Sequence, residues 1–217
     1  MVDVGAQEML AAVAAGDDVE IDRLLAANPG LAAARGADGL SAVMQARYHG
    51  HAWAAERLAD ALPELDLYEA AALGHSDRVK ALVEARPDAV RAEAPDGFTA
   101  LHLAAFFGQL EAAAVLLEHG AAPDAVAGNG SLLRPLHSAA AGGHAAIVGL
   151  LLERGADPNA RQQGGYVPLH SAAGRGDEAS VRLLLERGAD RDLRADDGRR
   201  PRDLAAAESR VAELLSA

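Results

Sequence analysis

A segment that recurs at a nearly fixed interval constrains the fold of this chain more than any other feature. Residues 96–124 read DGFTALHLAAFFGQLEAAAVLLEHGAAPD, and two later segments can be laid over them so that His137 and then His170 fall on His102. The steps from 102 to 137 and from 137 to 170 are 35 and 33 residues. A repeat of this period is typical of a stacked helical array. The whole chain of 217 residues is therefore expected to form one array rather than separate domains.

Each copy has the pattern of two short helices. A turn that carries glycine leads into a first helix, and proline, which suits the first helical position, stands at three of the four expected starts. These starts are Ala100, Pro135, Pro168 and Pro201. The second helix carries paired apolar residues one turn apart, such as Ile147 and Val148 followed by Leu151 and Leu152. Gly108, Gly143 and Gly176 should end the first helices, and Gly120, Gly155 and Gly188 should end the second helices as left-handed caps.

The core of each copy resembles the ankyrin repeat. The Thr-Pro-Leu-His-x-Ala-Ala core of that family is similar to residues 99–105 (TALHLAA), 134–140 (RPLHSAA) and 167–173 (VPLHSAA), and its Gly-Ala-Asp ending recurs at 155–157 and 188–190. The resemblance implies an all-α ankyrin-repeat solenoid with short projecting β-turn fingers. Arg134, Val167 and Arg200 stand where the family usually has threonine, so the hydroxyl bond that tightens this turn should be absent there.

The same spacing, more loosely kept, extends the array to about seven helix pairs. Gly16 and Gly50 are 34 residues apart, but only 24 residues separate Gly50 from Gly74. The ten missing residues fall between Pro63 and Leu67, so we predict that the second unit runs into the next helix without a finger. The expected units are 1–37 (an N-terminal cap), 38–63 (short and finger-less), 64–95, 96–128, 129–161, 162–194 and 195–217 (a C-terminal cap).

The charge and composition limit the partners. The formal net charge of −12 opposes binding to nucleic acids and to anionic membranes, because their phosphates would be repelled. The chain has no cysteine, which fits a reducing compartment, and its first ten residues lack the basic flank and apolar core of a secretory signal. No apolar run is long enough to span a bilayer. We therefore expect a cytoplasmic monomer.

Candidate chemical sites have simpler structural explanations. His102, His137 and His170 are equivalent residues of successive units, whose helices pack about 8–10 Å apart, whereas zinc needs nitrogens at about 2.0–2.1 Å. We therefore expect these histidines to stabilise turns and predict no metal. The glycine-rich turns at 128–130 and 163–165 lack the lysine and hydroxyl of a phosphate loop. No serine is placed with a histidine and an acid, so we predict no catalytic residue, no cofactor and no enzymatic activity.

The residues that the repeat does not require point to a binding surface. By the resemblance, the residue after the turn glycine and the two before the inter-helix glycine face a concave groove. All three Phe and two of the three Tyr lie at these positions, and aromatic residues are the usual anchors of protein interfaces. The predicted partner-binding residues are Tyr48, His49, Leu73, Phe98, Phe106, Phe107, Tyr166 and Arg175. The alternative for Phe106 or Phe107 is packing over a neighbouring helix, and we expect Trp53 to pack.

These observations predict a non-catalytic module that binds a protein partner through the concave groove and the fingers. The partner should dock over units two to four on an apolar strip, centred where the missing finger leaves the groove open, with Tyr166 and Arg175 as a polar extension. One alternative is a small-ligand or anion binder that uses Arg134, Tyr166 and Arg175. A less favoured alternative is an enzyme built on a repeat scaffold.

Overall fold

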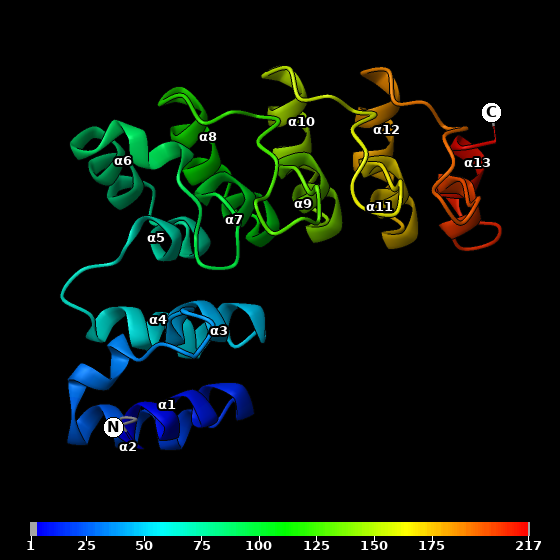
Figure 1. Ribbon diagram of the computed structural model, residues 1–217. Coiled ribbons are helices and arrows are strands. Elements are labelled where there is room, and N and C mark those ends of the chain that lie inside the picture. The colour runs from blue at the N-terminus through cyan, green and yellow to red at the C-terminus, as the bar shows by residue number, and fades with distance from the viewer. Residues whose placement is uncertain (1–3, 217) are drawn as a thin grey trace.

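Helices and turns make up the whole computed structural model, which describes residues 4–216 (Figure 1). The prediction of an all-α solenoid is confirmed, and within this range the extended structure is limited to two isolated bridges. The helices are α1 (Val4–Ala15), α2 (Asp18–Ala27), η1 (Pro29–Ala33), α3 (Ala42–Tyr48), α4 (Ala52–Ala61), α5 (Leu67–Leu73), α6 (Ser76–Ala85), η2 (Pro87–Arg91), α7 (Ala100–Phe107), α8 (Leu110–Glu118), α9 (Pro135–Gly142), α10 (Ala145–Glu153), α11 (Pro168–Arg175), α12 (Glu178–Glu186), η3 (Pro201–Leu204) and α13 (Arg210–Leu214). None of them is long and apolar enough to cross a membrane.

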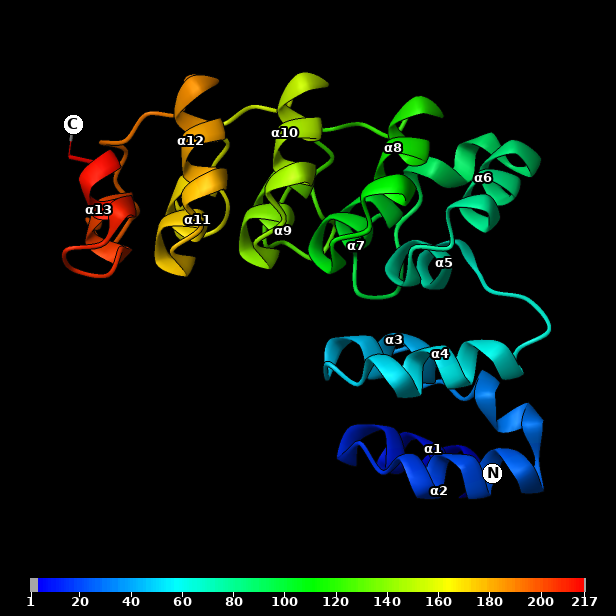
Figure 2. The same ribbon diagram turned by 180° about the vertical axis from the view of Figure 1, so that it is seen from behind.

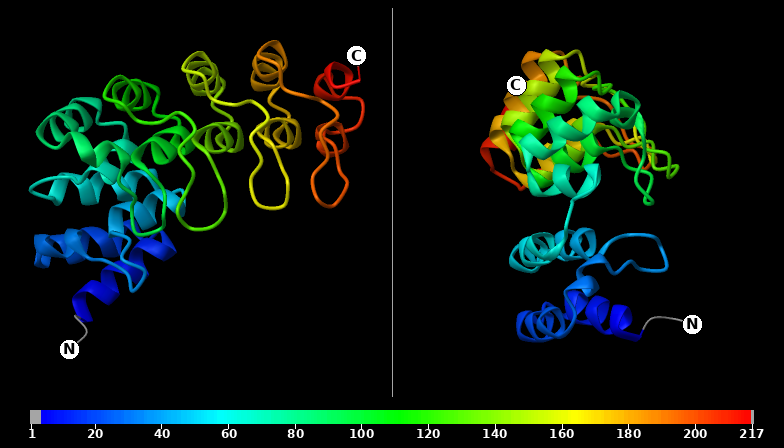
Figure 3. Two further views of the ribbon diagram at one scale, coloured as in Figure 1. Left: turned by 45° about the horizontal axis from the view of Figure 1, so that its top comes forward. Right: turned by 90° about the vertical axis from the view of Figure 1, so that its left-hand side faces the viewer.

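From α5 onwards the helices stand in two rows. The inner row contains α5, α7, α9 and α11, and the outer row contains α6, α8, α10 and α12 (Figures 1 and 3). Gly108, Gly143 and Gly176 end three inner helices at φ values of 80°, 77° and 74°, in the left-handed region that glycine adopts without a steric penalty. The apolar stripes of both rows meet between them, so that Leu101, Leu116, Leu136, Leu151 and Leu169 are completely buried.

Fingers project from the array just before the inner helices. Within the described residues each finger is closed by a backbone hydrogen bond, from Gly36 to Leu40, Ala94 to Phe98, Ala127 to Leu133, Gln162 to Tyr166 and Ala195 to Arg199. The third of these spans two residues more than the others. Neighbouring fingers also bond to one another, with Gly128 N–H on Gly97 O at 2.9 Å and Asp196 N–H on Gly164 O at 2.9 Å. The fingers from unit four onwards therefore form a connected row.

The segment between α4 and α5 carries no finger, as predicted. α4 ends at Ala61, α5 begins at Leu67, and Asp66 caps α5 by accepting the Tyr68 and Glu69 N–H groups. Within α5, Glu69 takes the place that the motif histidine has in α7. Its Oε2 accepts the Asp66 N–H at 2.9 Å, as His102 Nδ1 accepts the Thr99 N–H at 3.3 Å. α5 is consequently one residue shorter than α7 at its start.

The array turns sharply at this finger-less segment. Figures 1 and 2 show α1 to α4 lying below α5 rather than in line with the helices that follow. The buried residues divide at the same point, since α1 to α4 share one core with Leu73, whereas Leu67 and the later helices share another. A small third cluster of Met44, Ala72 and Leu103 joins α3, α5 and α7. The missing finger therefore lets unit two fold back towards unit four.

The last unit keeps only part of the pattern. Pro201 opens its first helix as predicted, but this helix is the single 3₁₀ turn η3. Asp203 replaces the motif histidine and performs the same capping role, because its Oδ2 accepts the Arg200 N–H at 2.8 Å. η3 packs on α11 and α13 packs on α12, which covers the end of the core.

Candidate functional site

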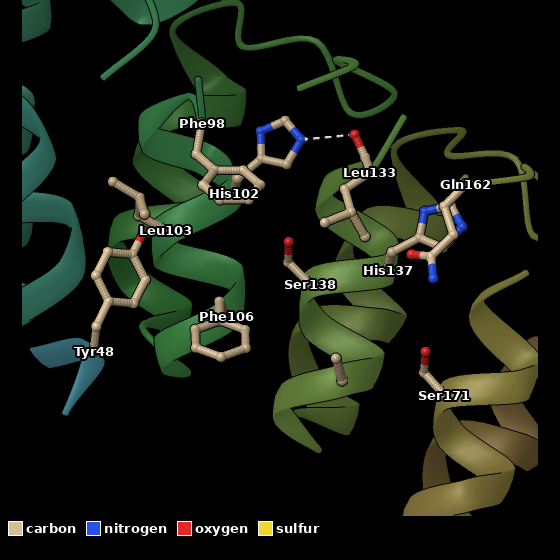
Figure 4. A pocket seen from close by; sticks show the side chains of 11 residues that line it. Tyr48, Phe98, His102, Leu103, Phe106, Leu133, His137, Ser138, Gln162 and Ser171 are labelled. Carbon is tan, nitrogen blue, oxygen red and sulfur yellow. Dashed lines mark hydrogen bonds between the residues drawn. The ribbon is translucent and has the colours of Figure 1, made fainter. Parts of the chain in front are cut away.

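A cavity of about 330 Å³ opens on the surface formed by the inner helices and fingers. We call it the groove pocket. Its lining residues come from α3, α7, α9, α11 and three fingers, and they are Tyr48, Phe98, His102, Leu103, Phe106, Leu133, His137, Ser138, Ala141, Gln162 and Ser171 (Figure 4). The pocket therefore gathers residues of units two, four, five and six around one space.

The two ends of the groove pocket differ in chemistry. Tyr48, Phe98, Leu103 and Phe106 lie at the α7 end, whereas Ser138, Gln162 and Ser171 lie towards α11 (Figure 4). In the described part of the chain, neither these two hydroxyls nor the Gln162 amide makes a side-chain hydrogen bond with protein. One end thus offers apolar surface, and the other offers hydroxyl and amide groups that are free to donate or accept.

Three of the predicted binding residues line this pocket. Phe106 is 41% exposed and Tyr48 is 38% exposed, which is high for large apolar side chains, and Phe98 is half-buried beside His102 with ring centroids 5.6 Å apart. Phe106 packs edge-on against Phe107 at 5.1 Å. The sequence analysis therefore named three of the four residues that line the α7 end of the pocket, and Leu103 is the fourth.

Tyr48 closes the space that the missing finger was expected to leave open. Its hydroxyl donates to Asp96 Oδ2 at 2.6 Å, and its ring lies 5.5 Å from the Phe107 ring. The guanidinium of Arg47 lies over the Phe107 ring, 4.5 Å from its centroid. Burial, reinforced by the bond to Asp96, raises the pKa of Tyr48. The expectation of an open groove at this point is wrong, because unit two contacts unit four directly and Phe107 is covered.

The other predicted binding residues lie outside the pocket. Leu73 is only 7% exposed and packs in the core of α1 to α4, because the array bends there. His49 is exposed and its ring stacks with that of His51 at 6.1 Å. Arg175 reaches back along the groove and donates to Ala141 O at 3.1 Å.

Tyr166 ties its own finger to the next one. Its hydroxyl donates to Asp197 Oδ2 at 2.5 Å, and it also contacts Arg199, whose guanidinium lies 5.6 Å from the ring centroid. The bond from Arg199 holds the pKa of the exposed Asp197 carboxyl below its usual range. Arg134 pairs instead with Asp124 at 3.7 Å. Arg134, Tyr166 and Arg175 therefore have separate partners and do not converge on one anion site.

The motif histidines stabilise the turns, as expected. His102 Nδ1 accepts from the Thr99 backbone and hydroxyl, and its Nε2 donates to Leu133 O at 3.2 Å, which joins the helix to the next finger. Arg134 and Val167 have no such hydroxyl. The Nδ1 atoms of His137 and His170 therefore accept only the backbone N–H of these two residues, each at 3.2 Å. Burial lowers the pKa of His102 and His137 to about 4, so both rings are neutral near pH 7.

Several exposed or pocket residues were missed by the sequence reasoning. Ser138 and Ser171 follow the motif histidines, in the position that Leu103 holds in unit four, and this shared position was the available signal. Leu132, on the longer finger, is 50% exposed with a φ of 57°, a conformation that leucine rarely adopts. Trp53 was expected to pack but is 45% exposed on α4, so that expectation is wrong.

Comparison with known proteins agrees with this architecture. The family model "Ankyrin repeats (3 copies)" matches residues 67–162 and 136–217, which together exceed half of the chain. The E3 ubiquitin-protein ligase XB3 of Oryza sativa subsp. japonica is 41% identical over 78 residues, or 36% of this chain. The matched segment spans only 17% of that ligase. On the family match, together with the paired helices, the fingers and the capping histidines, this chain belongs to the ankyrin repeat family.

Proposed function

We propose that this chain is a non-catalytic module that binds a protein partner on the surface formed by its inner helices and fingers. Ankyrin repeats are in general protein interaction modules, but a fold alone does not fix a function. The observation that carries the proposal is the groove pocket, where Phe106 and Tyr48 leave large apolar surfaces exposed beside unpaired polar groups. Large aromatic side chains at such sites dominate protein interfaces.

The proposed docking surface extends over units two to six. Tyr48 and Phe98 supply it from units two and four, and Leu132 and Leu133 extend it along the longer finger of unit five. Residues held in strained backbone conformations often lie at functional sites. We therefore include the exposed Leu132, which has a positive φ, in this surface. His49, Tyr166 and Arg175 lie at its margins, and Leu73 has no part in it.

The other partner classes fit less well. The net charge of −12 disfavours nucleic acids and anionic membranes as partners, because their phosphates would be repelled. We propose that the chain acts as a monomer in the cytoplasm. The residues suggested for an anion site have separate protein partners, as described above. Ubiquitin ligation belongs to the matched plant protein, and a match to 17% of its length supports a shared repeat module rather than shared chemistry.

A capture experiment with matched variants tests the proposal. Wild-type protein, Phe106→Ala and Trp53→Ala are immobilised and compared for the proteins that they retain from a lysate of the source. Trp53 is the control because its side chain is similarly exposed, at 45%, but lies on α4 and does not line the groove pocket. Proteins retained by the wild type and Trp53→Ala but lost with Phe106→Ala support the proposal. Equal retention by Phe106→Ala, or loss only with Trp53→Ala, contradicts it.

A further inference from the structure

The size of the groove pocket limits what can fill it. Its volume of about 330 Å³ is near the lower end of the range for ligand sites, about 300–1,000 Å³. A helix or a strand cannot enter such a space, whereas one large side chain can. Fully enclosed aromatic side chains in pockets of this kind are the usual energetic centres of protein interfaces.

The two ends of the pocket together favour a side-chain ring that has apolar faces and a polar group at its tip. The rings of Phe98 and Phe106 offer apolar walls, and aromatic pairs in offset or edge-to-face contact gain free energy beyond area burial. At the opposite end, Ser138, Gln162 and Ser171 would be left without hydrogen bonds if a purely apolar group displaced their water. A phenol hydroxyl or an indole N–H at the tip of the ring can form a hydrogen bond with Ser138, Gln162 or Ser171. Tyrosine and tryptophan meet both requirements, but phenylalanine and leucine meet only the first.

The charge beside the pocket indicates the neighbours of that ring. Asp96 lies on the finger that leads into α7, beside the pocket residue Phe98, and in the described structure its carboxylate forms no ion pair with arginine or lysine. This carboxylate accepts hydrogen bonds from the Tyr48 hydroxyl and the Phe98 N–H, and both residues line the pocket. Arg47 is held over Phe107. The Asp96 carboxylate is complementary to a basic residue next to the inserted ring.

We propose that the groove pocket receives one tyrosine or tryptophan side chain from a segment of the partner protein in which basic residues flank that ring. This proposal rests on the proposed function and specifies the chemistry of the partner. The ring fills the space between Phe98, Phe106 and Leu133, its polar tip bonds to Ser138, Gln162 or Ser171, and the flanking cations lie near Asp96.

Short peptides test the specificity of the pocket. The full chain, labelled with ¹³C at leucine and alanine methyl groups, is titrated by NMR with acetyl-lysyl-tyrosyl-lysinamide. Shifts should appear at Leu103, Leu133 and Ala141. The phenylalanine analogue should bind about two- to tenfold more weakly, because one hydrogen bond is lost. The analogue with glutamate flanks should bind more weakly still at low salt, and the combined Ser138→Ala and Ser171→Ala changes should reduce the preference for tyrosine.

Two matched variants test the location. Ala141→Trp fills the pocket from an exposed position on α9, whereas Ala146→Trp adds the same group at an exposed position on the outer helix α10. The first should abolish peptide binding and the second should leave it unchanged, with both variants folded by circular dichroism. Absent shifts in the wild type, equal binding of the tyrosine and phenylalanine peptides, or full binding by Ala141→Trp would overturn the proposal.

Failure of this proposal can be told apart from failure of the proposed function. If Phe106→Ala loses its captured proteins but the peptides do not bind the wild type, the docking surface stands and the inserted ring is refuted. If the peptides bind but captured proteins do not depend on Phe106, the pocket is not a protein docking site, and both proposals fall.

Discussion

Tyr48 donates a 2.6 Å hydrogen bond to Asp96 across 48 residues of sequence and thereby joins unit two directly to unit four. In a regular array the intervening unit would separate them. The contact exists because the segment before α5 has no finger, so that Gly39, on the finger before α3, comes to lie against Pro95, on the finger before α7. The same tyrosine lines the groove pocket. The bend in the array therefore positions one wall of the candidate site.

Removal of this bond should destabilise the chain modestly. Hydrogen bonds to charged groups contribute about 1.5–3 kcal/mol when buried; Tyr48 is 38% exposed, so we expect Tyr48→Phe to cost about 1 kcal/mol. Asp96→Ala should cost at least as much, because it also removes the acceptor of the Phe98 N–H. In urea unfolding the double variant should lose little more stability than Asp96→Ala alone, because both changes remove the bond between Tyr48 and Asp96. Fully additive losses would show that the two side chains do not interact.

The buried histidines predict sensitivity to acid. The pKa of His102 and of His137 is about 4 in the folded chain, and about 6.5 when unfolded. Between these values the unfolded chain binds protons that the folded chain does not, so stability is full above pH 6.5 and falls as the pH decreases towards 4. Each histidine should account for about 3 kcal/mol at pH 4. His137→Gln, which cannot titrate, should lose less stability than the wild type between pH 7 and 4, and parallel losses would contradict this assignment.

Leu151 and Leu133 should differ in their effect on stability. Leu151 is completely buried between the rows, so Leu151→Ala should cost about 2–5 kcal/mol, as buried leucine truncations generally do. Leu133 is only partly buried on a finger, so Leu133→Ala should cost clearly less. Denaturant melts of both variants check this difference. Equal losses would refute the assignment of Leu151 to the core.

Much of the repeat architecture could be predicted because it depends on local rules. Proline at the first helical position and glycine at the left-handed cap each act within a few residues, and the 24-residue step from Gly50 to Gly74 leaves too little chain for a finger. The structure contains all three features. The register of α5 could also have been found, since Asp66 and Glu69 have the three-residue spacing of a capping box.

The candidate site was predictable only in part because it depends on distant contacts. The aromatic positions were identified from their place in the repeat, but the sequence does not show that unit two folds back onto unit four. That bend buries Leu73, covers Phe107 with Tyr48 and closes the expected opening. The long finger likewise places Leu132 in an unfavourable conformation that no local pattern indicates.

Leu132 should be replaceable with a gain in stability. A side chain in the left-handed region costs about 1–2 kcal/mol, and asparagine tolerates this region better than leucine. Leu132→Asn should therefore raise the free energy of unfolding by up to about 1 kcal/mol. Val126→Asn is the control, because Val126 is similarly exposed, at 43%, without a positive φ. An unchanged or lower stability for Leu132→Asn, relative to the control, would show that its conformation is not strained.

Phe106 and Phe107 should separate binding from folding, although they are adjacent. Phe106 is 41% exposed at the pocket, whereas Phe107 is half-buried between Tyr48 and Arg47. Phe106→Ala should weaken partner affinity by about 2 kcal/mol or more, as expected of a hot spot, with little change in unfolding free energy. Phe107→Ala should instead lower stability, because it removes the ring that joins unit two to unit four. Isothermal titration with a captured partner and urea melts of each variant measure both quantities. If affinity survives Phe106→Ala but falls when outer-helix charges such as Glu153 and Arg182 are changed, the partner does not dock on the inner helices and fingers.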